Sequence, residues 1–355
     1  MPRHFISSIC LSGALAVAAL LGGCGGQSSQ SGQNSQRSQS GVATDAGPAG
    51  AKPATGAKGA TGKKLYWVQY LKGHPVHQMT QIAFRDGCKK LGYECEVIGT
   101  DGVDIPGTIA LAEQAMSRGD AAGMAIWTGD PTFNSFIAKV GKKGIPVILP
   151  HFPVPQGSIP GATGIISCDP AAYAREAAMQ MGKAIGGKGT VAITQGGFNS
   201  TENMVAQTFQ KTMREKYPAV KVLDPEEEGL SDASGAVAKA VSILQGHPDV
   251  VGALSTTGGG PTTWASAQKE TGRKIVSIGM DYTRVNLDFV KSGQVYAVVG
   301  QPLWEESSGA AELLDKAVRG KKIPWWTKLP APIITKDKLA PYYTLLGKVE
   351  AGLQQ

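Results

Sequence analysis

Histidines are the first residues in this 355-residue chain whose spacing could support chemistry. His74 and His77 lie close together in the run HPVH, and His151 could supply a third imidazole. Three imidazoles with an open position can bind zinc. Because no carboxylate or thiolate neighbours these histidines in the sequence, we predict that the protein holds no metal and no cofactor.

A glycine-rich stretch, GKAIGGKGT (residues 182–190), approaches the phosphate-loop pattern G-x-x-x-x-G-K-[ST]. Gly189 stands where a Ser or Thr hydroxyl would hold magnesium, and a helix is predicted before the stretch rather than after it. We interpret the stretch as a helix–strand turn. Since no G-x-S-x-G elbow and no Ser/His/Asp set are present either, we predict that the protein is not an enzyme.

Two cysteines, Cys88 and Cys95, flank the segment KKLGYE. A predicted helix end at residues 91–92 would reverse the chain between them and could bring them within bridging distance. Outside the cytosol such a pair can be oxidised. The sequence leaves two interpretations open, which are a disulfide and a pair of small buried residues.

The N-terminal region indicates export. Residues 1–23 have a short basic start and a short apolar core, which is the pattern of a signal peptide. Leu21-Gly22-Gly23-Cys24 resembles the lipobox of bacterial lipoproteins, and this resemblance implies cleavage before Cys24 and lipid on that residue. The alternative is a secretory signal with a chance cysteine. Residues 24–63 are mostly Gly, Ser, Gln and Ala, so we predict a disordered tether.

Composition limits the partners of the remaining chain. The formal net charge is +7, but the basic residues are scattered and do not alternate with aromatic residues. We therefore expect no nucleic-acid partner. The chain after residue 63 is long enough to form two lobes.

Short β-rich runs alternate with helical segments throughout that part of the chain, which predicts an α/β fold with parallel sheets built from βαβ units. Asp-Pro pairs at residues 130–131 and 169–170 predict helix starts. Ten predicted strands suggest two doubly wound sheets of about five strands each. The strands are expected at residues 65–70, 94–99, 121–127, 146–150, 163–167, 189–194, 220–224, 250–256, 274–279 and 295–300.

Ligands of open parallel sheets bind beyond the carboxyl ends of the strands, and the residues there mix aromatic rings with short polar groups. Such a mixture suits sugars, whose C–H faces stack on rings and whose hydroxyls need polar partners. The alternative is that Asp130 only caps a helix and Trp127 only fills the core. The candidate ligand-binding residues are Tyr70, Lys72, His74, His77, Trp127, Thr128, Asp130, His151, Phe198, Asn199, Thr257, Asp281, Tyr282, Gln301 and Trp304.

Several stretches resemble type I periplasmic substrate-binding proteins of the ribose/galactose branch, which feed ABC transporters. The resemblance covers roughly residues 65–345 and is carried, in order, by KKGIPVIL (142–149), CDPAAYAREAA (168–178), HPDVVGALSTT (247–257), IVSIGMD (275–281) and SGQVYAVVGQPLWEESSGAAELL (292–314).

This resemblance implies two lobes that are joined by three crossings and that hold a ligand in the cleft between them. The N-terminal lobe is expected to comprise residues 64–167 and 302–330. The C-terminal lobe is expected to comprise residues 168–301 and 331–345.

Two ligand positions of that family transfer directly, namely Asp281 and Gln301. Two others do not, because Val205 stands where the family has Arg and Thr257-Gly258 stands where it has Asn-Asp. These departures argue against an ordinary pentose or hexose. Lys72 and the three nearby histidines would suit a sugar acid or another anionic polyol.

The resulting hypothesis is a monomeric capture protein, held in the periplasm or at the cell surface through lipidated Cys24, that binds a sugar, sugar acid or related polyol and delivers it to an ABC permease. The alternative is a sensor of the same fold that presents its ligand to a membrane receptor or kinase. A transcriptional repressor of this fold would need an N-terminal helix-turn-helix, whereas this chain has the lipobox.

Overall fold

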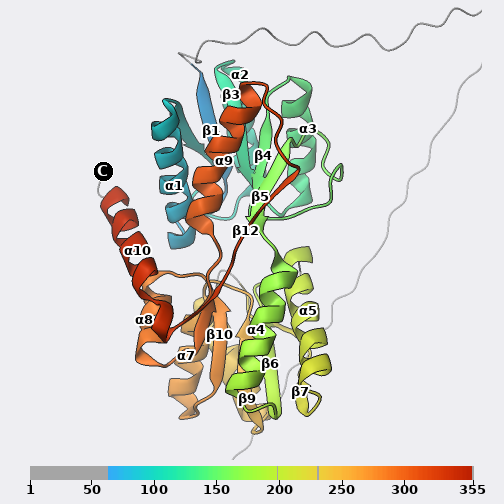
Figure 1. Cartoon of the computed structure of the whole chain (residues 1–355), viewed down its shortest axis with the longest axis vertical. Helices are drawn as coiled ribbons and strands as arrows, with labels where there is room; N and C mark the ends of the chain where they lie inside the picture. Colours follow the sequence, from blue (N-terminus) through green and yellow to red (C-terminus); the bar gives the residue numbers. More distant parts are fainter. Residues whose placement is uncertain (1–62, 198, 230–231, 354–355) are drawn as a thin grey trace, which may run out of the picture. The chain divides into compact units, whose positions relative to one another are not determined.

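The computed structural model of the chain describes residues 63–197, 199–229 and 232–353 (Figure 1). The predictions for the signal peptide, for Cys24 and for the tether up to residue 62 lie outside these residues, as does that for Phe198. Within the described ranges, no helix combines the length and the apolar character needed to cross a membrane.

The first of two sheets has six described strands, and all of them are parallel. Five come from the first half of the chain and the sixth from near its end. In spatial order they are β12 (Trp326–Leu329), β5 (Gly164–Cys168), β4 (Val147–Pro150), β3 (Ala121–Trp127), β1 (Lys64–Gln69) and β2 (Glu94–Ile98).

The second sheet has seven described strands, and only β13 runs antiparallel to its neighbour. Its main path is β13 (Ile333–Thr335), β11 (Ala297–Val299), β10 (Val276–Met280), β9 (Val250–Ser255), β6 (Gly189–Gln195) and β7 (Val220–Val222). The short strand β8 (Glu226–Glu227) also pairs with β6.

The α/β class and the doubly wound parallel sheets agree with the prediction, but the strand number differs. Strands β8, β12 and β13 were not predicted. Strand β12 has the sequence WTKL and is only partly buried, and β8 consists of two glutamates. Neither carries the apolar run that predicts a strand.

Helices cover both faces of each sheet (Figure 1). Those packed with the first sheet are α1 (Pro75–Leu91), α2 (Ile105–Ser117), α3 (Asn134–Lys142) with the preceding 3₁₀ turn η1 (Pro131–Phe133), and α9 (Leu303–Val318). Those packed with the second are α4 (Pro170–Ala184), α5 (Ser200–Lys216), α6 (Ala233–Gly246), α7 (Gly260–Thr271) and α8 (Arg284–Ser292). The 3₁₀ turn η2 (Lys336–Lys338) leads to α10 (Ala340–Leu353), which contacts both α1 and α8.

The side-chain alternation of β1 shows how the first sheet is covered. Leu65 and Trp67 lie in the core formed with α1 and α9, whereas Tyr66 and Val68 lie in the core formed with α2 and α3. Successive residues of a strand point to opposite faces of its sheet. A fully buried strand with helices on both sides therefore needs the continuous apolar run that the sequence provides.

The chain passes between the two sheets three times. The connections lie between β5 and α4, between β11 and α9, and between β12 and β13. The lobe boundaries stay a prediction, but apart from Cys168 at the end of β5 the strands of each sheet come from the segments assigned to its lobe.

Cys88 and Cys95 are joined by a disulfide with a Cα–Cα distance of 6.2 Å. Helix α1 ends at Gly92, which adopts φ 77°, a left-handed conformation that glycine takes without a Cβ penalty. This turn brings the start of β2 back beside the end of α1, so that the two sulfurs meet.

Candidate functional site

A cluster of rings lies at the carboxyl edge of the first sheet. Strands β1, β3 and β4 end there, since they are parallel neighbours. The Trp127 and His151 rings are stacked, with centroids 4.4 Å apart, and His77 lies 5.7 Å from Trp127 on another side. We call Tyr70, His77, Trp127, His151 and Phe152 the ring cluster, because each ring contacts another member.

Trp127 is 3% exposed and one of its faces is covered by His151. Trp127 therefore does not offer the free ring face on which a sugar was expected to stack. The other four members of the ring cluster are partly exposed, and of these His151 and Phe152 pack against each other beside Trp127.

The positive charges expected in this region are neutral or paired. Burial lowers the pKa of His77 to about 4 and lowers the pKa of His74 as well. The Lys72 ammonium lies 3.7 Å from the Asp101 carboxylate. The structure therefore does not provide the cationic surface that suggested an anionic ligand.

Three other predicted residues have local structural roles. The His74 imidazole accepts a hydrogen bond from the Val76 amide and caps α1. Asp130 caps the 3₁₀ turn η1 through the Thr132 amide at 2.8 Å, and the Thr128 hydroxyl accepts from the Asp130 amide at 3.0 Å. The interpretation of Asp130 as a cap therefore matches its contacts.

His151 also contacts a buried carboxylate that sequence reasoning missed. Its Nδ1 lies 2.8 Å from Oε1 of Glu306, a residue of α9 that is fully buried. Burial opposes a charged imidazole, but the charge and hydrogen bond of Glu306 outweigh it and raise the pKa of His151. Burial raises the pKa of Glu306 too, against the influence of His151.

Asp281 directly follows β10 and is 6% exposed. Its Oδ1 is buried without a hydrogen-bond partner among the described residues. Burial raises the pKa of this carboxyl to about 7, opposed by the nearby His151 and assisted by Glu306. A buried carboxyl without a donor is unusual in folded proteins and marks a candidate ligand contact.

The carboxyl edge of the second sheet carries a hydroxyl and carboxylate network. Thr257 follows β9, and its hydroxyl donates to Oε1 of Glu228 at 2.5 Å, which also accepts from Ser255 at 2.9 Å. Beside it, the Thr256 hydroxyl and the Gly196 amide donate to Glu202. Neither glutamate was among the predicted site residues.

The other predicted ligand-binding residues in the C-terminal half of the chain do not all lie together. Asn199 is exposed and caps α5. Gln301 is buried in the connection between β11 and α9. Tyr282 lies in the core, 5.0 Å from the Tyr342 ring, and Trp304 donates its backbone N–H to the Tyr282 hydroxyl. Tyr282 therefore packs inside the protein, unlike the expected binding residue.

Three non-glycine residues among those described have a positive φ, and all three follow strands at these edges. They are Leu71 (56°), His151 (76°) and Asp281 (68°). Such conformations are strained for residues with a Cβ and cluster at functional sites. The structure around the ends of β1, β4 and β10 must therefore hold these residues in conformations that they would rarely adopt by themselves.

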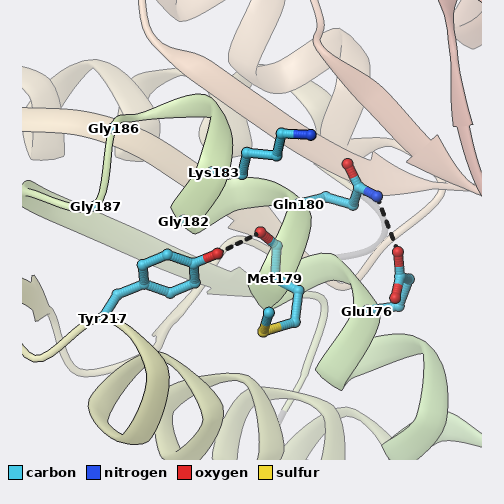
Figure 2. Close-up of a pocket in the computed structure, with 8 residues that line it drawn as sticks. All are labelled: Glu176, Met179, Gln180, Gly182, Lys183, Gly186, Gly187 and Tyr217. Carbon is cyan, nitrogen blue, oxygen red and sulfur yellow. Dashed lines mark hydrogen bonds between the residues drawn. The ribbon is translucent and has the colours of Figure 1, made fainter.

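A separate pocket of about 520 Å³ lies on the second sheet's side, beside α4 (Figure 2). Lys183, Gly186, Gly187 and Tyr217 line it, so it contains part of the glycine-rich stretch tested above. The amides of Gly186 and Gly187 donate to the carbonyls of Lys183 and Gly182. They are not free to hold phosphate, which agrees with the interpretation as a helix–strand turn.

Among the described residues, no group of three or more His, Cys, Asp or Glu side chains is placed to hold a metal ion. The candidate site thus consists of the ring cluster, the His151–Glu306 pair, Asp281 and the second sheet's carboxylate network. Together these groups can cover an apolar face and accept several hydrogen bonds.

Comparison with solved structures identifies the fold. A sugar-binding protein of a sugar ABC transporter from Bacillus halodurans has a TM-score of 0.73 at 22% identity, over 79% of this chain and 100% of that one. An ABC transporter solute-binding protein from Burkholderia graminis, solved with D-arabinose, has a TM-score of 0.72 at 22% identity, over 80% and 98%. Both share the arrangement of two α/β sheets.

In sequence, the chain is 25% identical over 204 residues to a xylitol-binding protein of Mycolicibacterium smegmatis. The match spans 57% of this chain and 58% of that relative's length. Residues 65–322 match the periplasmic binding protein domain family. Because this match extends over most of the chain, the protein belongs to the periplasmic binding protein family, with the type I fold.

Proposed function

We propose that the protein captures a sugar or sugar alcohol between the carboxyl edges of its two sheets and delivers it to an ABC permease. The observation that carries the proposal is Asp281, whose buried carboxyl oxygen has no donor among the described residues and which lies near His151 of the ring cluster. A ligand hydroxyl would supply that donor. The xylitol-binding relative and the neighbour solved with D-arabinose support this ligand class.

The chemistry of binding follows from the two edges. His151 and Phe152 offer ring surface to C–H groups, while carboxylates accept from hydroxyls. Hydrogen bonds to charged groups contribute about 1.5–3 kcal/mol each. Since the ligand would contact both lobes, its differential affinity would favour the closed arrangement. A smaller radius of gyration in small-angle scattering at saturation would support closure, and an unchanged profile would contradict it.

Calorimetry with xylitol and D-arabinose tests the proposed ligand class. At 100 times its dissociation constant, a true ligand should add about 2.7 kcal/mol to the free energy of unfolding. Asp281→Asn should weaken its binding tenfold or more. Asp249→Ala is the control, because the Asp249 carboxylate accepts a hydrogen bond from the Thr190 hydroxyl just before β9 begins. This place is at the end of the sheet opposite its carboxyl edge. Absence of binding to every sugar and polyol tested would contradict the proposal.

Attachment to the membrane is a second element of the proposal. Family membership implies an extracytoplasmic location, and Leu21-Gly22-Gly23-Cys24 supports a lipid anchor. Cys24→Ser should abolish fatty-acid labelling and move the protein out of the membrane fraction. Absence of label on the wild-type protein would contradict the anchor.

A further inference from the structure

We propose that Glu228 is a ligand-binding residue that accepts a hydrogen bond from a ligand hydroxyl, and that with Asp281 and Glu306 it makes the site select uncharged polyols over sugar acids. This inference rests on the proposed function and adds to it a residue and a charge class. Glu228 was not among the ligand-binding residues predicted from the sequence.

The backbone and one carboxylate oxygen of Glu228 are firmly held. Its amide donates to the Gln195 carbonyl at 2.7 Å, next to the pairing of β8 with β6. Its Oε1 accepts from the hydroxyls of Ser255 and Thr257. With one oxygen fixed by two donors, the direction of the other oxygen is fixed as well.

That other oxygen, Oε2, is buried and has no hydrogen-bond partner among the described residues, and the whole residue is 6% exposed. A buried acceptor without a donor destabilises a protein, and such groups are few in native structures. The two hydroxyls that donate to Oε1 satisfy only one of the two carboxylate oxygens. A ligand hydroxyl would account for the other half.

The position of Glu228 places it at the same edge as Asp281. The carboxylate is bonded to the end of β9, and Asp281 follows β10, the neighbouring parallel strand. The Thr257 carbonyl accepts from the Met280 amide at 3.3 Å, which ties the two strand ends together. Neighbouring strands lie roughly 5 Å apart, a separation that hydroxyls of one polyol can span.

The charges at these edges favour donors on the ligand. Glu228, Asp281 and Glu306 each have a buried oxygen without a partner among the described residues. His151 is already bonded to Glu306, and Lys72 is paired with Asp101. Three buried carboxylate oxygens without a partner among the described residues would repel a carboxylate on the ligand but would accept hydrogen bonds from its hydroxyls.

Calorimetry on Glu228→Gln with xylitol, D-arabinose and D-arabinonate tests the inference. Glutamine keeps an oxygen for Ser255 and Thr257 but replaces the unpartnered oxygen by an NH₂ group. We expect affinity for the neutral probe that binds to fall about tenfold to a hundredfold. The wild type should bind D-arabinonate at least tenfold more weakly than D-arabinose. This ratio of affinities should be smaller in the variant.

Glu227→Gln is the matched control, because it removes the same charge from the exposed neighbouring residue and should leave every affinity unchanged. Ser255→Ala is a second variant, which keeps Glu228 but removes one of its two hydroxyl donors. It should weaken the binding of neutral probes severalfold. It decides the matter if Glu228→Gln does not fold.

Wild-type binding of a neutral probe combined with unchanged affinity in Glu228→Gln would overturn this inference while leaving the proposed function intact. Equal binding of D-arabinose and D-arabinonate by the wild type would overturn the charge selection. If the wild type bound none of the probes, the proposed function would fail and this inference with it.

Discussion

The carboxyl edges of the two sheets differ in chemistry although the sheets are built alike. The first edge presents the ring cluster, in which Trp127 and His151 stack on each other. The second presents hydroxyls and carboxylates, among them Thr257, Glu228 and Asp281. Most groups at the first edge are rings that pack with one another, and only Glu306 there keeps a carboxylate oxygen without a partner among the described residues, whereas both Glu228 and Asp281 do so at the second edge.

This difference indicates a division of roles. The first edge forms an apolar wall whose shape is set by its own packing. In the proposed site, the second edge supplies two of the three buried carboxylate oxygens that lack a partner among the described residues, and Glu306 supplies the third. Specificity for hydroxyl pattern should therefore reside mainly in the second edge, and stability of the site mainly in the first.

The largest predicted effect is on stability at the first edge. His151→Ala would leave Glu306 buried without its partner, and breaking a buried pair in this way costs about 3–5 kcal/mol. Without His151, nothing opposes the effect of burial, which raises the pKa of the Glu306 carboxyl. Urea unfolding of wild type and variant at pH 7 measures the loss in unfolding free energy.

The double variant His151→Ala/Glu306→Gln provides the control, since it removes the uncompensated charge and should recover part of the loss. A double variant as unstable as the single one would show that the charge pair is not the cause.

Asp281→Asn should produce opposite effects on stability and binding. The folded carboxyl has a pKa of about 7, above its usual value, so the folded state binds more protons than the unfolded state between about pH 4 and pH 7. Its contribution to stability is present below pH 4 and is lost as the pH rises through 7. The variant should therefore be more stable than wild type at pH 8, by on the order of 2–4 kcal/mol.

That gain should vanish near pH 4, where the wild-type carboxyl is protonated. Thermal unfolding from pH 4 to pH 8 tests the sign, and calorimetry at pH 8 should show weaker sugar binding by the same variant. A stability difference that does not change with pH would mean that the Asp281 carboxyl has its usual pKa in the folded protein. The second edge would then lack a carboxyl whose pKa is raised by burial.

Thr257→Val should have a smaller effect, because it removes one of the two hydroxyls that hold Glu228. Because the Ser255 hydroxyl still donates to the same oxygen, the loss should be about 1 kcal/mol, the net contribution of one hydrogen bond. Thr257→Ser keeps the hydroxyl and should behave like the wild type in thermal unfolding. If serine and valine variants were equally unstable, packing of the methyl group rather than the hydrogen bond would be responsible.

The smallest effect is expected for Lys72→Ala. This side chain was a candidate ligand residue, but it is paired with Asp101, and surface pairs contribute about 0–1 kcal/mol. Its removal should leave sugar affinity unchanged in calorimetry. A tenfold loss would place a cation in the site after all and would contradict the contrast between the two edges.

The sequence allowed much of the fold to be predicted because the central strands are buried on both faces. Runs such as AAGMAIW (residues 121–127) are apolar throughout, and all seven residues are buried in β3. The edge strand β12 could not be found in the same way, because only partial burial is required of it.

The candidate site was predicted unevenly. The rule that ligands bind beyond strand ends identified Asp281, Trp127 and His151, since strand ends are visible as ends of apolar runs. Glu228 and Glu306 lie in acidic stretches that resemble solvated surface, PEEEG and LWEESS. Their burial depends on β8 and on the packing of α9, which no local pattern reports.

The return of the chain to the first sheet has a consequence for how the protein folds. Helix α9 supplies Leu303, Ala310 and Leu314 to the same core as Leu65 and Phe84, and β12 forms the outer edge beside β5. The Cβ of any residue in place of Gly87 would lie 2.8 Å from the Ser308 carbonyl oxygen, so α1 and α9 pack closely.

The N-terminal part of the chain therefore lacks a complete core until residues beyond 300 have been synthesised. Folding that depends on such distant contacts is slow. The first sheet becomes complete only when β12, close to the end of the chain, has been synthesised and pairs with β5.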